Sequence, residues 1–209
     1  MDGAGYPGAI SLSPSGELLC IAYVYVDAGV LKTNVAFYNF GSVGENYNDH
    51  IVSSWSYTDL VVPMVQFMNG STAFAVGDSR LMIYTGSQKP VSAMEHLFDE
   101  EVQSVFYSED YIGLVFRSDD SNYRYRLDVW NSLGEKVGNY YFNIEYTDLF
   151  FGRDNFVAYN ETECLIMTLD EIEKYHGTFS KTVRLMLSGA SAYRYVLVTD
   201  NSIDTIQLR

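Results

Sequence analysis

The sequence predicts an all-β fold, arranged as a β-propeller-like array of about five blades with three or four strands each. Three observations lead to this prediction. Short apolar segments alternate with turn residues, similar segments recur about every 40 residues, and aromatic residues are abundant, with 18 Tyr and 12 Phe. Aromatic and β-branched residues suit half-buried strands. A period of about 40 residues with about four strands per repeat is typical of propeller blades.

The first blade is predicted over residues 9–59. Pro14 and Gly16 mark its first turn and Gly29 its second, because proline fixes φ and glycine permits positive φ. Residues 41–50 are predicted to form a polar loop. The expected strands are 9–13, 18–26, 30–40 and 51–57.

The next four blades repeat the order strand, turn, strand, turn, strand. Asn69-Gly70 is the clearest hairpin signal among their turns. One turn of helix is expected over residues 170–175. Equivalent positions in the five blades are Ile10, Val65, Val105, Leu149 and Leu185, which lie about 36 to 55 residues apart. The four predicted blades are 60–101, 102–148, 149–183 and 184–209.

The blades are predicted to form one domain, residues 1–209, with an open or partial ring. The last blade has three predicted strands, and residues 1–8 are too short and glycine-rich to complete it. Continuous apolar runs such as 18–26 fit strands that are covered on both faces. A β-sandwich is the alternative fold, since it also shows regularly spaced strands. Open blade edges are sites for strand pairing, which predicts self-association.

Charge narrows the choice of partners. The chain has 13 basic and 27 acidic residues, with a net charge of −14. This charge repels a phosphate backbone and anionic membrane surfaces, so nucleic acid is excluded as a partner. No stretch of 18 apolar residues is present, and residues 1–8 lack a signal-peptide pattern, so no membrane contact by this chain is expected.

No motif for catalysis, cofactor binding or metal binding is present. His50, His96 and His176 are far apart in the sequence, and none has a second histidine at zinc-ligand spacing. Nucleophile-elbow and phosphate-binding glycine motifs are absent. We therefore predict no catalytic, cofactor-binding or metal-ligating residues and no cofactor; the ligand-binding residues are not predicted.

Carboxylates are the one abundant chemical group. The densest sets are 99–101, 119–120, and Glu161 with Glu163. A glycosidase needs two carboxyl groups across a sugar, so a carbohydrate-active hydrolase or lyase is an alternative function. Residues 119–122 are expected to form a polar hairpin tip, with weak calcium binding as the other interpretation.

Cysteines and aromatic residues are expected in the interior. Cys20 and Cys164 lie in apolar runs and are predicted to be separate buried thiols, although a disulfide between them stays open. An aromatic cluster is expected to pack between blades, with sugar stacking or a protein interface as alternatives. Its members are Tyr123, Tyr125, Tyr140, Tyr141, Phe142 and Tyr146.

Four passages resemble an uncharacterised family of β-propeller-like proteins from Clostridia-type bacteria, domain of unknown function 5711. They are residues 12–16, 35–41, 104–116 and 195–202. The resemblance implies an extracytoplasmic propeller held at the cell surface by an upstream membrane-spanning segment. The family has no established activity, so no functional residue is carried over.

The expected function is a non-catalytic module that binds a protein or ligand, such as a cell-surface glycan, because function in repeat scaffolds usually resides in surface loops. The alternatives are the carbohydrate-active enzyme and a structural assembly module that associates through open edges.

Overall fold

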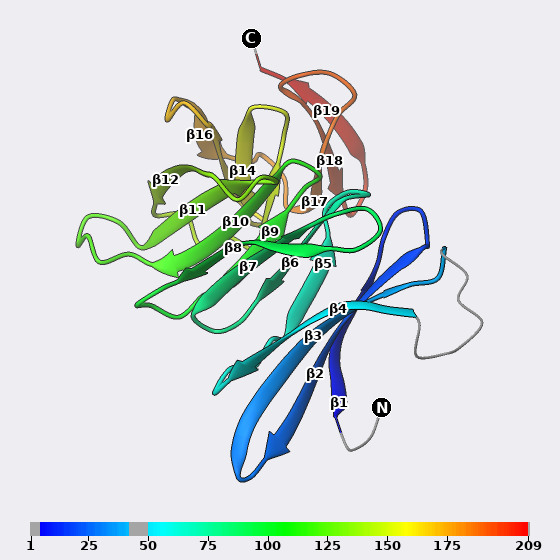
Figure 1. Ribbon diagram of the computed structural model, residues 1–209. Coiled ribbons are helices and arrows are strands. Elements are labelled where there is room, and N and C mark those ends of the chain that lie inside the picture. Colours follow the sequence, from blue (N-terminus) through cyan, green and yellow to red (C-terminus); the bar gives the residue numbers. More distant parts are fainter. Residues whose placement is uncertain (1–4, 42–49, 209) are drawn as a thin grey trace. The chain divides into compact units, whose positions relative to one another are not determined.

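The computed structural model describes residues 5–41 and 50–208, which form an all-β protein (Figure 1). Within these residues, nineteen strands form five antiparallel sheets, four of four strands and one of three. Strands that follow one another in the chain are neighbours in every sheet, so each sheet is a meander. The predicted array of about five meander blades is confirmed. Among the described residues, no helix has the length and hydropathy needed to cross a membrane.

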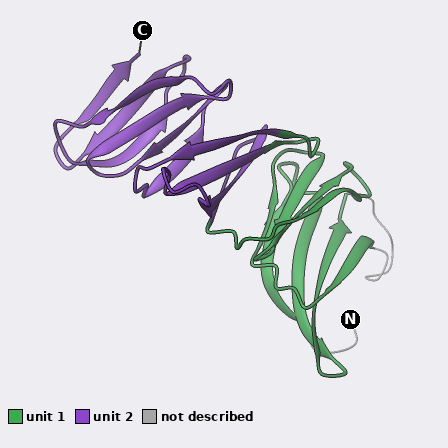
Figure 2. Cartoon of the chain, turned by 90° about the vertical axis from the view of Figure 1, so that its left-hand side faces the viewer, with its two compact units in different colours: residues 1–103, 130–136 green, residues 104–129, 137–209 purple. Residues whose placement is uncertain are grey.

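The chain divides into two compact units (Figure 2). Unit 1 comprises residues 1–103 and 130–136, and unit 2 comprises residues 104–129 and 137–209. The single domain over residues 1–209 stays a prediction.

The first sheet contains β1 (Tyr6–Leu12), β2 (Leu18–Asp27), β3 (Val30–Asn39) and β4 (Ile51–Thr58). Ala28 and Gly29 join β2 to β3 with φ angles of 51° and 83°, a two-residue turn whose twist matches the strands. β1 starts at Tyr6, so excluding residues 6–8 from the first strand was wrong. Pro7 is tolerated because β1 is an edge strand with a register shift between Pro7 and Ala9. Most of the predicted 41–50 loop lies outside the described residues.

The second sheet packs against the first within unit 1. Its strands are β5 (Met64–Phe67), β6 (Thr72–Val76), β7 (Arg80–Thr85) and β8 (Val91–Leu97). Phe37 lies at the centre of the shared core, with its ring centroid 6.0 Å from Trp55, 6.0 Å from Phe67 and 5.1 Å from Tyr84. Tyr84 is fully buried, and its hydroxyl lies 2.8 Å from that of Tyr57.

The other three sheets lie mainly in unit 2. The third has β9 (Ser104–Tyr107), β10 (Tyr111–Arg117), β11 (Tyr125–Asn131) and β12 (Lys136–Phe142), and the tip of its last hairpin, residues 130–136, counts with unit 1. The fourth has β13 (Asp148–Phe151), β14 (Asn155–Tyr159), β15 (Glu163–Thr168) and β16 (Glu173–Thr178). The fifth has β17 (Val183–Ser188), β18 (Arg194–Thr199) and β19 (Ile203–Gln207).

Two apolar cores join the sheets of unit 2, one between the third and fourth sheets and one between the fourth and fifth. In the first of these cores, Gly113 allows close packing, because a Cβ at that position would lie 2.7 Å from the ring of Phe151. The predicted aromatic cluster largely belongs to this core, in which Tyr140 and Phe142 are buried and Tyr125 and Tyr146 are partly buried. Tyr123 and Tyr141 instead pair near the surface, with ring centroids 5.5 Å apart.

The helical turn expected over residues 170–175 was wrong. Glu173 already begins β16, and the residues before it form a tight turn in which Glu171 has a φ of 64°. The backbone N–H of Ile172 donates a hydrogen bond to the Thr168 hydroxyl at 3.0 Å. β16 is mostly exposed, so its sequence lacks the apolar alternation that identifies a strand.

One ion pair of unit 2 is buried. Arg126 and Asp128 project from the same face of β11, with Nε and Oδ1 3.0 Å apart and side chains 11% and 4% exposed. The Arg126 guanidinium also lies over the Phe116 ring, 4.8 Å from its centroid. Removing either partner would break this buried ion pair.

We expect Asp128→Ala to lower the free energy of unfolding by about 3–5 kcal/mol, because breaking a buried ion pair is strongly destabilising. The matched control is Glu145→Ala, which removes the exposed ion pair with Arg124 and should cost less than about 1 kcal/mol. Urea denaturation followed by circular dichroism measures both changes. Equal effects of the two substitutions would contradict the structural role of the buried pair.

Candidate functional site

The outward face of the fifth sheet is apolar and uncovered. Strand register places Leu185, Val198 and Ile203 in one row across β17, β18 and β19, and Leu187, Val196 and Thr205 in the next. Leu185, Leu187 and Ile203 are 39%, 46% and 74% exposed. We call this surface, formed by the six residues of the two rows, the open face.

A groove lies on the other side of the fifth sheet, between β16 and β19. It encloses about 290 Å³. Tyr175 and Phe179 form one wall, and Ile206 and Leu208 form the other. The groove is mostly apolar, with Lys181 and Asp204 as its charged residues. Its full lining is Tyr175, Thr178, Phe179, Ser180, Lys181, Val183, Leu197, Thr199, Asp204, Ile206 and Leu208.

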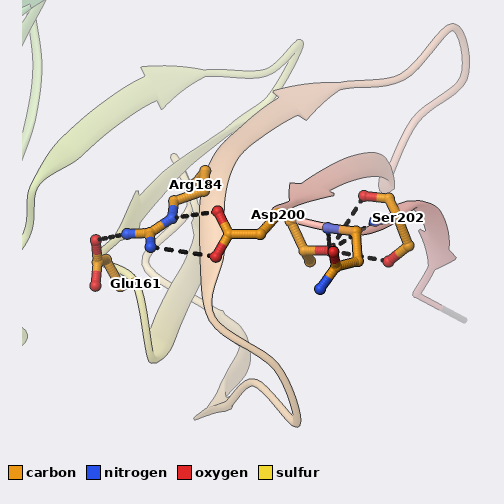
Figure 3. A network of polar contacts seen from close by, with 6 residues as sticks. Glu161, Arg184, Asp200 and Ser202 are labelled. Carbon is orange, nitrogen blue, oxygen red and sulfur yellow. Dashed lines mark hydrogen bonds and ion pairs between the residues drawn. The ribbon is translucent and has the colours of Figure 1, made fainter.

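A polar network extends beside the groove (Figure 3). The Arg184 guanidinium donates to Asp200 on one side, with Nε–Oδ1 and Nη2–Oδ2 distances of 2.9 and 3.3 Å, and to Glu161 on the other. Lys181 forms an ion pair with Asp204 at 3.1 Å. These side chains are about half exposed.

The turn between β18 and β19 fixes the position of Asp200. The Thr199 hydroxyl accepts hydrogen bonds from the backbone N–H groups of Asn201 and Ser202, at 3.3 and 3.0 Å. The Ser202 hydroxyl then donates to Asp204 at 2.8 Å. A threonine that bonds the backbone ahead of it is a standard way to stabilise a tight turn.

The network favours charged forms of its members. Hydrogen bonding from Arg184, together with its charge, holds the pKa of Asp200 below the usual value for aspartate. Hydrogen bonds from Ser202 and then Lys181 lower the pKa of Asp204. Hydrogen bonding and the charge of Asp200 raise the pKa of Arg184.

This arrangement does not provide an acid and base pair for a glycosidase. Glu161 and Asp200 approach one guanidinium from opposite sides, so Arg184 fills the space that a sugar would need. A glycosidase also needs one carboxyl group with a raised pKa as proton donor, whereas Asp200 is held ionised. The arrangement is suited to holding two neighbouring turns together and to presenting charge beside an apolar groove.

The other carboxylates and the histidines singled out from the sequence do not converge on one site. Glu163 Oε2 lies 3.8 Å from His176 Nε2, and Asp120 accepts hydrogen bonds from Asn122 within the predicted hairpin tip. His96 packs against the rings of Phe98 and Trp130. The part of the chain that the structure describes contains no group of three His, Cys, Asp or Glu residues arranged to hold a metal ion.

The predicted pair of separate buried thiols is confirmed. Cys20 and Cys164 are both free and completely buried. Burial raises the pKa of Cys20 far above its usual range, and burial followed by the charge of Glu163 raises that of Cys164 to about 12. Both stay protonated thiols at neutral pH and are unsuited to nucleophilic catalysis.

Arg184, Asp200, Lys181 and Asp204 were not singled out from the sequence. A signal for part of the network was present, since Glu161 and Asp200 occupy the turns after the second strand of their sheets. Aligned repeats therefore place these two residues at the same end of neighbouring sheets. The role of Arg184 carried no such signal, because a single arginine within a strand is common.

A family model described as a family of unknown function, DUF5711, matches residues 1–208. The chain therefore belongs to this family, as the resemblance in four passages predicted. No curated relative matches the sequence.

Solved structures of propeller and WD40 type share the fold. Hsv2 of Kluyvelomyces marxianus has a TM-score of 0.53 at 11% identity, over 98% of this chain and 59% of that chain. The Pan2 WD40 domain of Neurospora crassa has a TM-score of 0.53 at 10% identity, over 90% and 58%. BBS1N, solved in complex with ARL6DN, has a TM-score of 0.52 at 9% identity, over 99% and 62%. This chain thus spans about three-fifths of the length of these proteins.

We expect a carboxyl NMR titration to place the Asp200 midpoint below the ordinary value of about 3.9, and Arg184→Met to raise it toward that value. Because the pKa is lowered in the folded state, the associated stability is present above about pH 4 and is lost as the pH falls through the folded pKa. Lys181→Met, which leaves the Arg184 contact intact, is the control. An unchanged midpoint in Arg184→Met would contradict the assignment.

Proposed function

We propose that this family member is a non-catalytic, β-propeller-type module that binds another protein through its fifth sheet. The open face carries the proposal, because it presents contiguous apolar side chains on an otherwise strongly acidic chain. Leu185, Leu187 and Ile203 are exposed there. The valines that pair with them on β18 are also apolar, so the exposed residues form one patch. Exposed apolar patches of this kind mark interaction sites.

Two further observations support protein binding. Asp200 follows β18 at one end of the same sheet and forms an ion pair with Arg184, so charged groups border the apolar residues of the open face. Protein interfaces commonly combine an apolar centre with a polar rim. In addition, one structure with a similar fold, BBS1N, was solved in complex with another protein, ARL6DN.

A structural assembly module is the second candidate, favoured by the outward face of the first sheet. Register places Leu12, Leu19, Tyr38 and Ile51 in one row of that face and Ile10 in the next. Ile10, Leu12 and Ile51 are 64%, 56% and 43% exposed. If a further β-sheet covered each of these two faces, the chain would be one part of a larger assembly. Light scattering across a wide concentration range tests whether a second copy provides that cover.

The proposal includes an extracytoplasmic location, supported by the family resemblance. We expect protease treatment of intact native cells to degrade this chain while a cytoplasmic marker protein survives. Detection by immunoblotting before and after cell lysis measures the difference. Survival of the chain until lysis would contradict this location and would leave the binding proposal standing.

We expect Ile203→Lys to abolish capture of a protein partner from the native host, because it places a charge at the most exposed of the three leucine and isoleucine residues of the open face. Leu133→Lys is the matched control, since Leu133 is 69% exposed but lies in the turn between β11 and β12. Quantitative mass spectrometry after affinity capture, followed by direct binding of the purified partner, measures the loss. Equal capture by both variants, or turnover of a polysaccharide by the purified chain, would refute the proposal.

A further inference from the structure

A polar pocket of about 260 Å³ lies between the fourth and fifth sheets, within unit 2. It is formed by the turn after β13 and the turn after β17, with the first residues of β14 and β18, and β19 contributes nothing to its lining. It shares no residue with the groove or with the open face. Sites for drug-sized ligands enclose roughly 300–1,000 Å³, so this pocket suits a smaller ligand, about the size of a single sugar.

Small residues in the turn after β17 leave this space open. Residues 188–192 read Ser-Gly-Ala-Ser-Ala, and all of them line the pocket. Two backbone hydrogen bonds hold the turn, from the Gly189 N–H to the Arg194 carbonyl at 2.6 Å and from the Arg194 N–H to the Ser191 carbonyl at 3.1 Å. Within the described residues, the N–H groups of residues 190–193 donate no hydrogen bond. The turn therefore presents four unused backbone donors.

Asn155 adds a donor on the opposite wall. Its side chain is 2% exposed and lies against Gly152, where a Cβ would be 2.7 Å from Asn155 Oδ1. Oδ1 accepts a hydrogen bond from the Tyr195 hydroxyl at 3.3 Å, and Nδ2 donates to Asp154 Oδ1 at 3.0 Å. An amide nitrogen has two hydrogens, so one of them is left for a ligand.

Arg153 brings a positive charge to the pocket. Several arginines of this acidic chain are neutralised by a carboxylate, namely Arg80, Arg124, Arg126 and Arg184. Arg153 is exposed and forms no ion pair or hydrogen bond in the part of the chain that the structure describes. Its guanidinium thus keeps five N–H donors, in a fork that matches a carboxylate or a phosphate. Lys174, with Nζ 5.8 Å from the Tyr193 ring centroid, offsets the charge of Asp170 near the same ring.

The acidic group beside the pocket is already engaged. One oxygen of Asp154 accepts from the Tyr193 hydroxyl at 2.9 Å, and the other accepts from Asn155. The hydrogen bond to Asp154 raises the pKa of Tyr193, and burial raises the pKa of Tyr195 to about 12. Both tyrosines are therefore neutral at pH 7 and add no negative charge to the pocket.

We propose that this pocket binds a small ligand through an oxyanion group, either a carboxylate or a phosphate. Its donors are the Arg153 guanidinium, the Asn155 amide and the unused N–H groups of residues 190–193. Hydrogen bonds from such donors to an anion are shorter and stronger than those between neutral groups. Successive backbone N–H groups in a turn are a recurrent anion site. The proposal does not depend on protein binding by the open face.

The experiment titrates the whole chain with three probes and follows the amide signals by NMR. The probes are glucuronate, inorganic phosphate and, as the neutral counterpart, glucose. We expect an anion to shift the signals of residues 190–193 until they saturate, while glucose leaves them unchanged and residues 77–79 in unit 1 serve as the reference. Tighter binding of glucuronate would assign a carboxylate ligand, and tighter binding of phosphate would assign a phosphate ligand.

We expect Arg153→Met to weaken binding of the anion about tenfold, because it removes the paired charged donors. Arg153→Lys keeps the charge but loses the fork, so the loss should be smaller. Lys89→Met is the matched control, since it removes the same charge from an exposed turn of unit 1. Circular dichroism checks that each variant is folded.

Three results would overturn the proposal. They are the absence of saturable binding by either anion, binding of glucose as tight as that of glucuronate, and equal losses in Arg153→Met and Lys89→Met. Anion binding that leaves the signals of residues 190–193 unshifted would place the ion elsewhere and would overturn it as well. Capture by Ile203→Lys is measured separately, so either proposal can fail while the other stands.

Discussion

A four-stranded meander has two faces and cannot bury both of them alone, and this constraint governs the whole structure. The first and second sheets share one core, and the three sheets of unit 2 share two more. Burial of each large apolar side chain contributes roughly 1.5–3 kcal/mol, so the contact between sheets is the dominant stabilising interaction. Polar groups strengthen the same contact, as where the Ser11 hydroxyl of β1 accepts a hydrogen bond from the Phe67 N–H of β5 at 3.0 Å.

The same constraint explains why the candidate site lies on the fifth sheet. A sheet with a neighbour on one side only keeps its other face in solvent, and here that face remains apolar. A sheet face that contacts only solvent is expected to carry polar side chains instead. The Arg184 and Lys181 contacts then hold the adjoining turns in place, so the apolar face and the groove have a defined shape.

Much of the fold could be predicted because its signals are local. Gly29 and the Asn69-Gly70 pair mark hairpins through backbone conformation, and continuous apolar runs such as that from Leu18 to Val26 mark strands with covered faces. The outer strands β8, β12 and β16 were not identified. Most residues of β8 and β16 are exposed, and β12 is buried only at Tyr140 and Phe142, so none of the three shows a long apolar alternation. β1 begins before Pro7 because β1 is an edge strand, where a missing backbone N–H is tolerated. The edge position is apparent only in the assembled sheet.

The candidate site was much harder to predict, because its residues meet only after folding. Glu161 could be noted as part of a dense acidic group, but its contact with Arg184 joins two sheets across 23 positions of the chain. Leu185 and Leu187 are of the same residue type as many buried strand residues. No local sequence feature shows that their face of the sheet stays uncovered. The isolated thiols were predictable because a small apolar residue within an apolar run is buried in almost any β fold.

Cys20 lies in unit 1 and Cys164 in unit 2, each without any exposed surface. A thiol reagent can therefore reach either sulfur only when the surrounding sheets separate, and the two labelling rates report on the two units independently. The native sequence thus contains one internal probe of opening for each unit. With these probes, the stabilisation of unit 2 by a bound partner becomes measurable without any engineered label, since unit 1 serves as the reference within the same molecule.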